Sequence, residues 1–351
     1  MPNPVLTKAI DAVASGRDLG AGEAGEVLAE IMRGNASETQ IAGFLIALRT
    51  KGETVPEVAG LAQTMRQFAA SVTPRRGDLL DTAGTGGGRR TFNVSTTAAL
   101  IAAGAGCAVA KHGNRSATSL SGSADLLEAL GARIDLSPSQ VADCIDRTGF
   151  GFMFAPTHHA ATRYVIPVRH ELAVRTIFNL LGPLTNPAGA TRQLIGVSDA
   201  AVLEVVAGAL SRLGAVRALV VNGRDGVDEI STAAATQVVE VNGHDIRRYE
   251  IQPQEVGVQP LGDSQLELLA GNSPQRNAAV TRAILDGEPG PATELAAINA
   301  GAAIYAAGAT ASIAAGVEAA RAAIADGSAL AALERFVAQT NAQTGAPAAT
   351  R

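Results

Sequence analysis

A glycine-rich loop between a strand and a helix is the feature that most limits how this chain can fold. GTGGG at residues 84–88 follows the apolar run 79–83, and NVST at residues 93–96 opens a helix. In such a loop backbone N–H groups approach an anion closely, and the helix N-terminus adds donors and positive partial charge. Hydroxyls that can donate to phosphate or bind a hard cation lie on both sides: Thr85, Ser95 and Thr96. A glycine run alone would fit a tight capped turn, but this combination predicts phosphate binding.

Short apolar runs alternate with helical segments beyond this loop. Strands are expected at 79–83, 107–110, 150–155, 193–197 and 217–221, with helices at 97–104, from 137, and at 200–213. This alternation is typical of an α/β fold with a largely parallel sheet. Asn242-Gly243 between two further apolar runs predicts a β-hairpin, so one antiparallel pair is expected as well. After Gln275 the chain is Ala-rich and helical to about Asn341.

The first 70 residues are predicted to be helical and to contain no strand. Ala24, Val27, Leu28 and Ile31 recur at the spacing of one helix face. Ser37 and Gln40, and likewise Thr54 and Glu57, have the spacing of a capping box, which starts a helix. We therefore predict a small helical domain at 1–72, a linker, a large α/β domain at 78–341 whose mostly parallel central sheet is flanked by helices, and a flexible tail at 342–351.

Composition excludes several classes of protein. The 351 residues carry a formal net charge of −5, which argues against a nucleic-acid-binding protein, because a duplex binder usually has a basic face. Two cysteines, Cys107 and Cys144, make no disulfide framework and are expected as buried thiols in a reducing compartment. No signal-peptide pattern opens the sequence, and no apolar stretch of about 18 residues occurs. We expect a cytoplasmic protein that does not associate with membranes.

Three further segments carry polar residues suited to binding. KHGNR at 111–115 follows a strand and precedes a Ser-rich stretch, which favours an anion pocket over a solvated loop. His158-His159 precedes Arg163, Arg169 and Arg175, and an arginine can hold a carboxylate with two hydrogen bonds. Neighbouring histidines on a helix do not face one site, so they do not indicate a metal.

The third of these segments is acidic. DGVDE at 225–229 follows a strand, and Asp228 and Glu229 are adjacent there. Two carboxylates at a strand end suit Mg²⁺ held partly by water and diphosphate oxygens, although a solvated acidic turn would have the same sequence.

Together these segments resemble the anthranilate phosphoribosyltransferases of tryptophan biosynthesis. The similarity covers nearly the whole chain and is strongest in residues 81–96, 111–125, 167–187 and 225–229. It implies a helical domain through which the family dimerises, joined by part of the 160–190 segment, packed on an α/β domain with the active site between them. It also implies transfer of phosphoribosyl from phosphoribosyl pyrophosphate (PRPP) to anthranilate, with Mg²⁺ as the cofactor.

Residue roles follow from the resemblance, position by position. PRPP would be bound by Gly84, Gly87, Thr91, Asn93, Ser95, Thr96, Lys111 and Ser123. The same binding segments contribute Thr85, His112, Gly113, Arg115 and Ser119. Mg²⁺ would be held by Ser95, Asp228 and Glu229, and anthranilate by Asn114 and Arg169. Lys111 and Arg169 are the predicted catalytic residues.

Three departures from the family pattern affect these expectations. The phosphate loop lacks the aspartate of the usual GTGGDG and is one residue shorter, with Arg89 and Arg90 following Gly88. His159 interrupts the usual HPA, and Ala173 replaces the glycine of LGVRT. Alternatives therefore remain: a paralogue with another aromatic acceptor, a pyrimidine nucleoside phosphorylase, which would lack the acidic metal pair, and a non-catalytic relative that binds nucleic acid.

Overall fold

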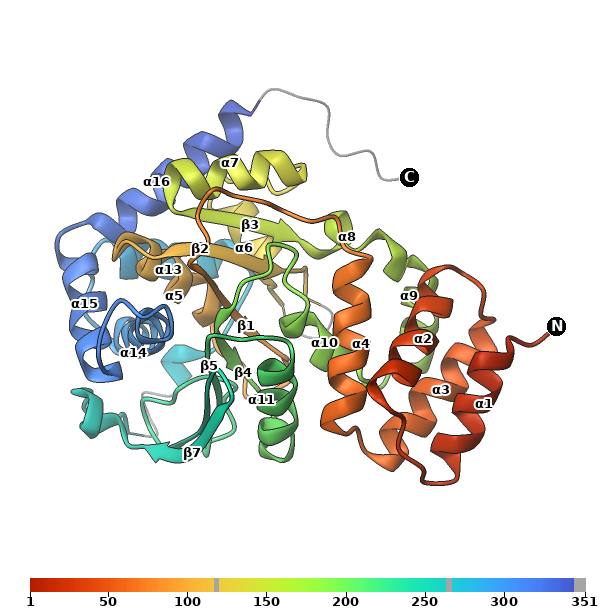
Figure 1. The fold of residues 1–351 in the computed structure, drawn as a ribbon. Helices are drawn as coiled ribbons and strands as arrows, with labels where there is room; N and C mark the ends of the chain where they lie inside the picture. The colour runs from red at the N-terminus through yellow and green to blue at the C-terminus, as the bar shows by residue number, and fades with distance from the viewer. Residues whose placement is uncertain (117–119, 263–266, 344–351) are drawn as a thin grey trace.

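The computed structural model describes residues 1–116, 120–262 and 267–343. Four helices form the N-terminal unit at one side of the molecule (Figure 1). They are α1 (Pro4–Ala14), α2 (Ala21–Met32), α3 (Glu38–Lys51) and α4 (Val55–Gln67). The predicted face of α2 is buried, because Ala24, Val27, Leu28 and Ile31 are each at most 1% exposed. Residues 70–78 contain no helix or strand and lead into the sheet.

One seven-stranded sheet forms the centre of the larger unit, in the order β3-β2-β1-β4-β5-β6-β7. The strands are β1 (Leu79–Gly84), β2 (Ala108–Gly113), β3 (Phe150–Phe154), β4 (Arg192–Gly196), β5 (Arg217–Gly223), β6 (Thr236–Asn242) and β7 (Asp245–Ile251). The first five are parallel, and β6 and β7 form the predicted antiparallel hairpin. The chain builds β2 and β3 on one side of β1 and then returns to its other side with β4. Such a reversal opens a crevice at the carboxyl ends of the strands.

Helices cover both faces of the sheet (Figure 1). One apolar core joins the sheet to α5 (Val94–Gly104), α6 (Ser123–Ala129), α7 (Pro138–Thr148), α13 (Pro274–Leu285), α14 (Pro291–Ala306), α15 (Ile313–Ala325) and α16 (Ser328–Ala342). A second core lies on the opposite face, with α11 (Leu203–Arg212) and the N-terminal helices. Neighbouring residues alternate between the two, since Leu219 belongs to the first core and Val220 to the second. The predicted fold class is confirmed.

The segment after β3 joins the two units. It forms α8 (Ala155–His158), a 3-10 turn (Ala160–Tyr164), α9 (Ile166–Leu172) and α10 (Phe178–Leu184). Val165, Val168, Ile177 and Leu181 are buried in the same apolar core as the N-terminal helices. This segment therefore holds the helical unit against the carboxyl-terminal edge of the sheet.

Three local predictions from the sequence differ from the structure. Ser37 accepts a hydrogen bond from the Gln40 N–H, but the Gln40 side chain bonds Asn3 and does not close the capping box. The Ala-rich region after Gln275 consists of four separate helices, broken at glycines such as Gly287, Gly308 and Gly327. The last of them continues to Ala342, the first residue of the predicted tail; residues 344–351 lie outside the described part of the chain.

Candidate active site

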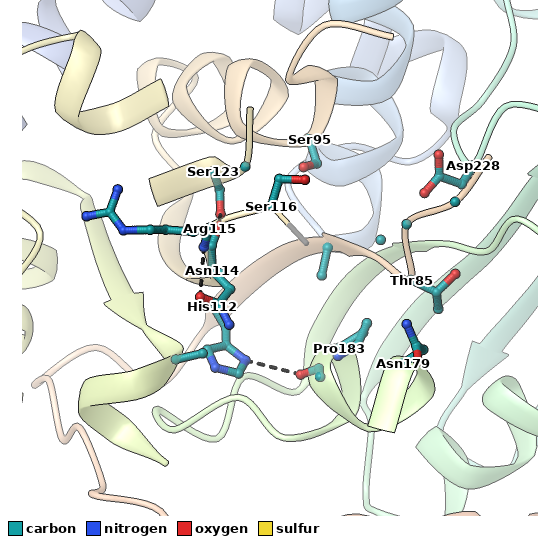
Figure 2. A pocket seen from close by; sticks show the side chains of 18 of the residues that line it. Thr85, Ser95, His112, Asn114, Arg115, Ser116, Ser123, Asn179, Pro183 and Asp228 are labelled. Carbon is teal, nitrogen blue, oxygen red and sulfur yellow. Dashed lines mark hydrogen bonds between the residues drawn. The ribbon is translucent and has the colours of Figure 1, made fainter. Parts of the chain in front are cut away.

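A cavity of about 650 Å³ opens at the carboxyl ends of β1, β2 and β3, beside the loop after β5 (Figure 2). The sequence-predicted site residues that line it are Gly84, Thr85, Gly87, Thr91, Asn93, Ser95, Thr96, Lys111, His112, Gly113, Asn114, Arg115, Ser123, Arg169, Asp228 and Glu229. Ser119, also predicted, lies outside the described residues. Segments separated by more than a hundred residues are thus brought to one cavity.

Arg175, in the segment between α9 and α10, fixes the glycine loop in place. Its guanidinium donates to the carbonyl oxygens of Thr85 and Gly86 and, over 2.7 Å, to Ser198 Oγ. Gly87 has a φ of +87°, and a side chain there would lie 2.8 Å from the Arg175 guanidinium. Only glycine combines this left-handed backbone with so close an approach. The sequence offered Arg175 as one of three arginines but assigned it no function.

Lys111 lies buried below the glycine loop. Its Nζ donates over 2.6 Å to the carbonyl oxygen of Thr82 and lies 3.5 Å from Ser95 Oγ. Burial lowers the pKa of Lys111 to about 8, although the nearby Asp81 carboxylate opposes the shift. Asp81 is itself fully buried and accepts hydrogen bonds from the Asn186 side chain and the His112 N–H. A positive charge is therefore held beneath the loop where a phosphate would lie.

The N-terminus of α5 forms the next part of the wall. Thr96 is fully buried, and its hydroxyl has no hydrogen-bond partner among the described residues. Asn93 binds the Ser121 backbone and side chain as well as Asn277, which ties the helix to the Gly/Ser loop and to α13. Helix α5 has 11 residues, and a free hydroxyl at its N-terminus is suited to donating a hydrogen bond to a phosphate oxygen.

Asp228 and Glu229 form an acidic pair opposite this helix end. Side chains at Gly84 or Gly88 would meet the Asp228 carboxylate at 3.0 and 2.8 Å. Glu229 accepts a 2.9 Å hydrogen bond from Thr91 through Oε1, while Oε2 has no partner in the described ranges. Burial raises the pKa of Asp228, and burial together with the charge of Asp228 raises the pKa of Glu229 well above its usual value. Two adjacent carboxylates withdrawn from water indicate that a cation belongs beside them.

The donor set suits Mg²⁺ shared with a substrate. Within the described residues no group of three or more His, Cys, Asp or Glu side chains could hold a metal ion. Asp228 and Glu229 supply two hard oxygen ligands, which leaves further positions for water and diphosphate oxygens, as Mg²⁺ prefers. The residues present therefore fit the predicted ion.

Arg115 differs from its predicted role. Its guanidinium donates to Asp125 over 2.8 Å and to Glu128 over 2.9 Å, and it lies 5.6 Å from the Phe154 ring centroid. Figure 2 shows the side chain directed away from the other labelled residues. Two carboxylates neutralise its charge, so Arg115 orders the loop that contains Asn114 rather than adding positive charge to the cavity.

Arg169 lies at the other end of the cavity, on α9. Its guanidinium lies 5.6 Å from the Phe178 ring centroid, and burial lowers its pKa. Within the part of the chain that the structure describes, Arg169 forms no ion pair. An unpaired guanidinium beside an aromatic ring can hold the carboxylate of an aromatic acid.

Two neutral histidines complete this end. The rings of His112 and His159 lie 5.0 Å apart, and burial lowers both pKa values, that of His159 to about 4. The Nε2 atom of each has no hydrogen-bond partner among the described residues. His158 does not line the cavity but bonds the carbonyl oxygen of Ala70 in the linker. Of the two adjacent histidines, only His159 lines the cavity.

Comparisons with known proteins agree with this arrangement. Two family models match: "Glycosyl transferase family, helical bundle domain" over residues 7–69 and "Glycosyl transferase family, a/b domain" over residues 76–330. Fold and cavity together thus define a two-domain glycosyl transferase. Anthranilate phosphoribosyltransferases from Rubrobacter xylanophilus and Laribacter hongkongensis are 52% and 49% identical to it, each over 95% of this chain and 97% of the relative. The chain belongs to the anthranilate phosphoribosyltransferase family.

Solved structures show the same fold. The anthranilate phosphoribosyltransferase of Thermus thermophilus has a TM-score of 0.90 and 47% identity, covering 95% of this chain and 99% of that one. The Saccharomyces cerevisiae enzyme in complex with PRPP and Mg has a TM-score of 0.87 and 26% identity, covering 96% and 98%. Among the described residues, no helix has the length and hydropathy of a membrane span.

Proposed function

We propose that this protein transfers the phosphoribosyl group of PRPP to anthranilate, giving N-(5-phosphoribosyl)anthranilate and pyrophosphate in tryptophan biosynthesis. One observation carries the proposal: a single cavity contains a glycine loop with an acidic pair at one end and unpaired Arg169 beside an aromatic ring at the other. The first end suits an activated sugar diphosphate and the second an aromatic carboxylate. The names of the relatives and the yeast complex with PRPP and Mg support both substrates and the cation.

The residues of this chain bind and orient the two substrates. Lys111 and the free hydroxyl of Thr96 hold PRPP oxygens, with Gly84, Gly87 and Asn93 shaping the loop and Ser123 closing the opposite side. Asp228, Glu229 and Ser95 hold Mg²⁺, which when bound supplies positive charge to the leaving diphosphate. Arg169 and Asn114 hold anthranilate so that its amine faces ribose C1.

The reaction displaces pyrophosphate from ribose C1 through a transition state with oxocarbenium character. The amine of anthranilate is already a nucleophile, so no strong general base is needed. His112 and His159 stay neutral and leave the charge of this end to Arg169. Positioning and stabilisation of negative charge on the leaving group account for catalysis.

One assay tests the proposal directly. Purified protein is mixed with PRPP, Mg²⁺ and anthranilate, and the loss of anthranilate fluorescence is followed. Turnover that needs all three components supports the proposed reaction. Absence of turnover with anthranilate, together with turnover of another aromatic amine, would identify a paralogue with a different acceptor; phosphorolysis of a nucleoside without Mg²⁺ would instead identify a nucleoside phosphorylase.

The domain roles are part of the same proposal. Residues 78–341 are the PRPP-binding catalytic domain, and residues 1–72, joined by part of the 160–190 segment, form the contact of a homodimer. Support comes from α3, which packs on α9 and exposes Ile46. Light scattering after size exclusion tests the dimer. We place the enzyme in the cytoplasm, since Cys107 and Cys144 are free buried thiols.

A further inference from the structure

Two arginines line the cavity beside the acidic pair. Arg89 and Arg90 follow the glycine loop and are both exposed. Both line the same cavity as Asp228 and Glu229. In the described ranges neither side chain has an ion pair or hydrogen bond. Two positive charges beside the acidic pair are therefore not neutralised by any side chain of the described residues.

The backbone around the pair is anchored on both sides to the acidic loop. Before it, Gly88 packs so closely on Asp228 that a side chain would lie 2.8 Å from the carboxylate. Within it, the Arg89 N–H donates over 2.7 Å to the Gly226 carbonyl oxygen. After it, Thr91 donates to Glu229 over 2.9 Å. The arginines therefore form a two-residue bridge whose position is fixed relative to the proposed Mg²⁺ ligands.

The charge of this bridge matches the end of the substrate that Mg²⁺ binds. Residues 84–93 contain no Asp or Glu, so Arg89 and Arg90 give the loop two positive charges. A diphosphate carries several negative charges, more than one divalent cation neutralises. Arginine donates two parallel N–H groups to phosphate oxygens, which gives both charge and orientation.

We propose that Arg89 and Arg90 bind the diphosphate of PRPP and stabilise its negative charge as the bond from ribose C1 to the diphosphate oxygen breaks. The electron pair of that bond passes to the diphosphate, and the arginines donate hydrogen bonds to its oxygens. This inference rests on the proposed function. It assigns part of the stabilisation of the leaving group to two arginines of the shortened loop.

A competing explanation assigns the same arginines to the protein itself. Both also line a small cavity behind the loop together with Asp225, whose Oδ1 has no hydrogen-bond partner among the described residues. If the arginines only neutralise Asp225, their removal would lower the free energy of unfolding and leave diphosphate binding intact.

Calorimetry at saturating Mg²⁺ separates these explanations. The variants are Arg89→Ala, Arg90→Ala, the double alanine variant and the double lysine variant. The control is Arg335→Ala, an exposed arginine on α16, away from the cavity. The probes are inorganic pyrophosphate and ribose 5-phosphate, which represent the two ends of PRPP. We expect the double alanine variant to weaken pyrophosphate binding about tenfold or more, since two charge-assisted contacts are lost, and to leave ribose 5-phosphate binding unchanged.

The lysine variant should recover part of the affinity, because charge is restored without the planar fork. Unchanged pyrophosphate binding in the double alanine variant would overturn the inference, as would weakened ribose 5-phosphate binding alone. A loss in Arg89→Ala and in Arg90→Ala no larger than that in Arg335→Ala, which also removes one charge, would show only the effect of net charge and would overturn it too. Wild-type turnover is measured in parallel: if wild type fails with PRPP and anthranilate, the proposed function fails, whereas working wild type with an unaffected double variant refutes the arginine inference alone.

Discussion

The ammonium group of Lys111 lies 2.6 Å from the carbonyl oxygen of Thr82, on the strand that leads into the glycine loop. A fully buried cation with one carbonyl partner is unusual, and desolvation lowers its pKa to about 8. Binding of an anion above it would restore the charged form. The pair thus links the ionisation of one side chain to the presence of PRPP.

We expect kcat/KM for PRPP to fall as the pH rises through about 8. Below this pKa Lys111 is charged and binds phosphate; above it the amine is neutral and the charge-assisted contact is lost. Because bound phosphate raises the pKa again, kcat should be less sensitive than kcat/KM. Lys111→Ala should weaken PRPP binding by about 1.5–3 kcal/mol and abolish the alkaline decline. A wild-type profile that stays flat through pH 8, or unaltered PRPP affinity in the variant, contradicts the assignment.

The acidic pair should bind Mg²⁺ with release of protons. Burial raises the pKa of both Asp228 and Glu229, and carboxylates must be ionised to bind the cation. Apparent affinity for Mg²⁺ should therefore fall as the pH is lowered toward these raised pKa values. Calorimetry of Mg²⁺ with pyrophosphate in two buffers of different ionisation enthalpy measures the protons released. Asp228→Asn with Glu229→Gln should lose both the release and most activity; full activity with an unchanged Mg²⁺ requirement would remove the pair from the site.

Arg169 should discriminate acceptors by their carboxylate. Arg169→Ala should raise the KM for anthranilate and lower kcat, while PRPP binding stays nearly intact. Arg169→Lys should rescue poorly, because a point charge lacks the fork that holds a carboxylate with two hydrogen bonds. Steady-state kinetics with anthranilate and with aniline, which has no carboxylate, provides the measurement. Equal turnover of the two amines by wild type would show that no carboxylate is recognised here, and His159 would be examined next.

Ala173 should limit the stability of the acceptor segment. It ends α9 with φ +51° and ψ 26°, and it is the one non-glycine residue with positive φ in the described ranges. Ala173→Gly relieves about 1–2 kcal/mol of backbone strain. The greater conformational freedom of the unfolded chain offsets about 0.4–1 kcal/mol of this. The free energy of unfolding of the variant should therefore be higher by about 0.5–1 kcal/mol. Urea unfolding measures the change. Ala307→Gly is the matched control, because Ala307 also ends a helix but has a φ of −63°. This change should lower the free energy of unfolding. Equal effects of the two changes would refute strain at Ala173.

Local patterns predicted the elements well, while contacts between distant segments could not be predicted. The Thr54–Glu57 spacing, the Asn242-Gly243 turn and the glycine loop each act within a few residues, and each structure formed as expected. The incomplete capping box at Ser37 depends on Asn3, 37 residues away from the Gln40 that it binds.

Burial and partners were the other quantities that the sequence did not specify. Arg115 follows a strand just as an anion-binding arginine would, yet two acids on the next helix neutralise it. Lys111 was expected at the cavity but not as a fully buried side chain, because its burial depends on how β1 and β2 pair. The adjacent histidines have different surroundings for a similar reason: His158 bonds the linker, and His159 faces the cavity.

Arg175 has a consequence for how the two substrates bind together. In the sequence it lies between Arg169 and Phe178 of the acceptor side, yet its guanidinium holds the carbonyl oxygens of the PRPP loop. Ordering of one loop therefore helps to order the other. The two binding equilibria are then thermodynamically linked: each substrate should increase the affinity for its partner, and by the same factor in both directions.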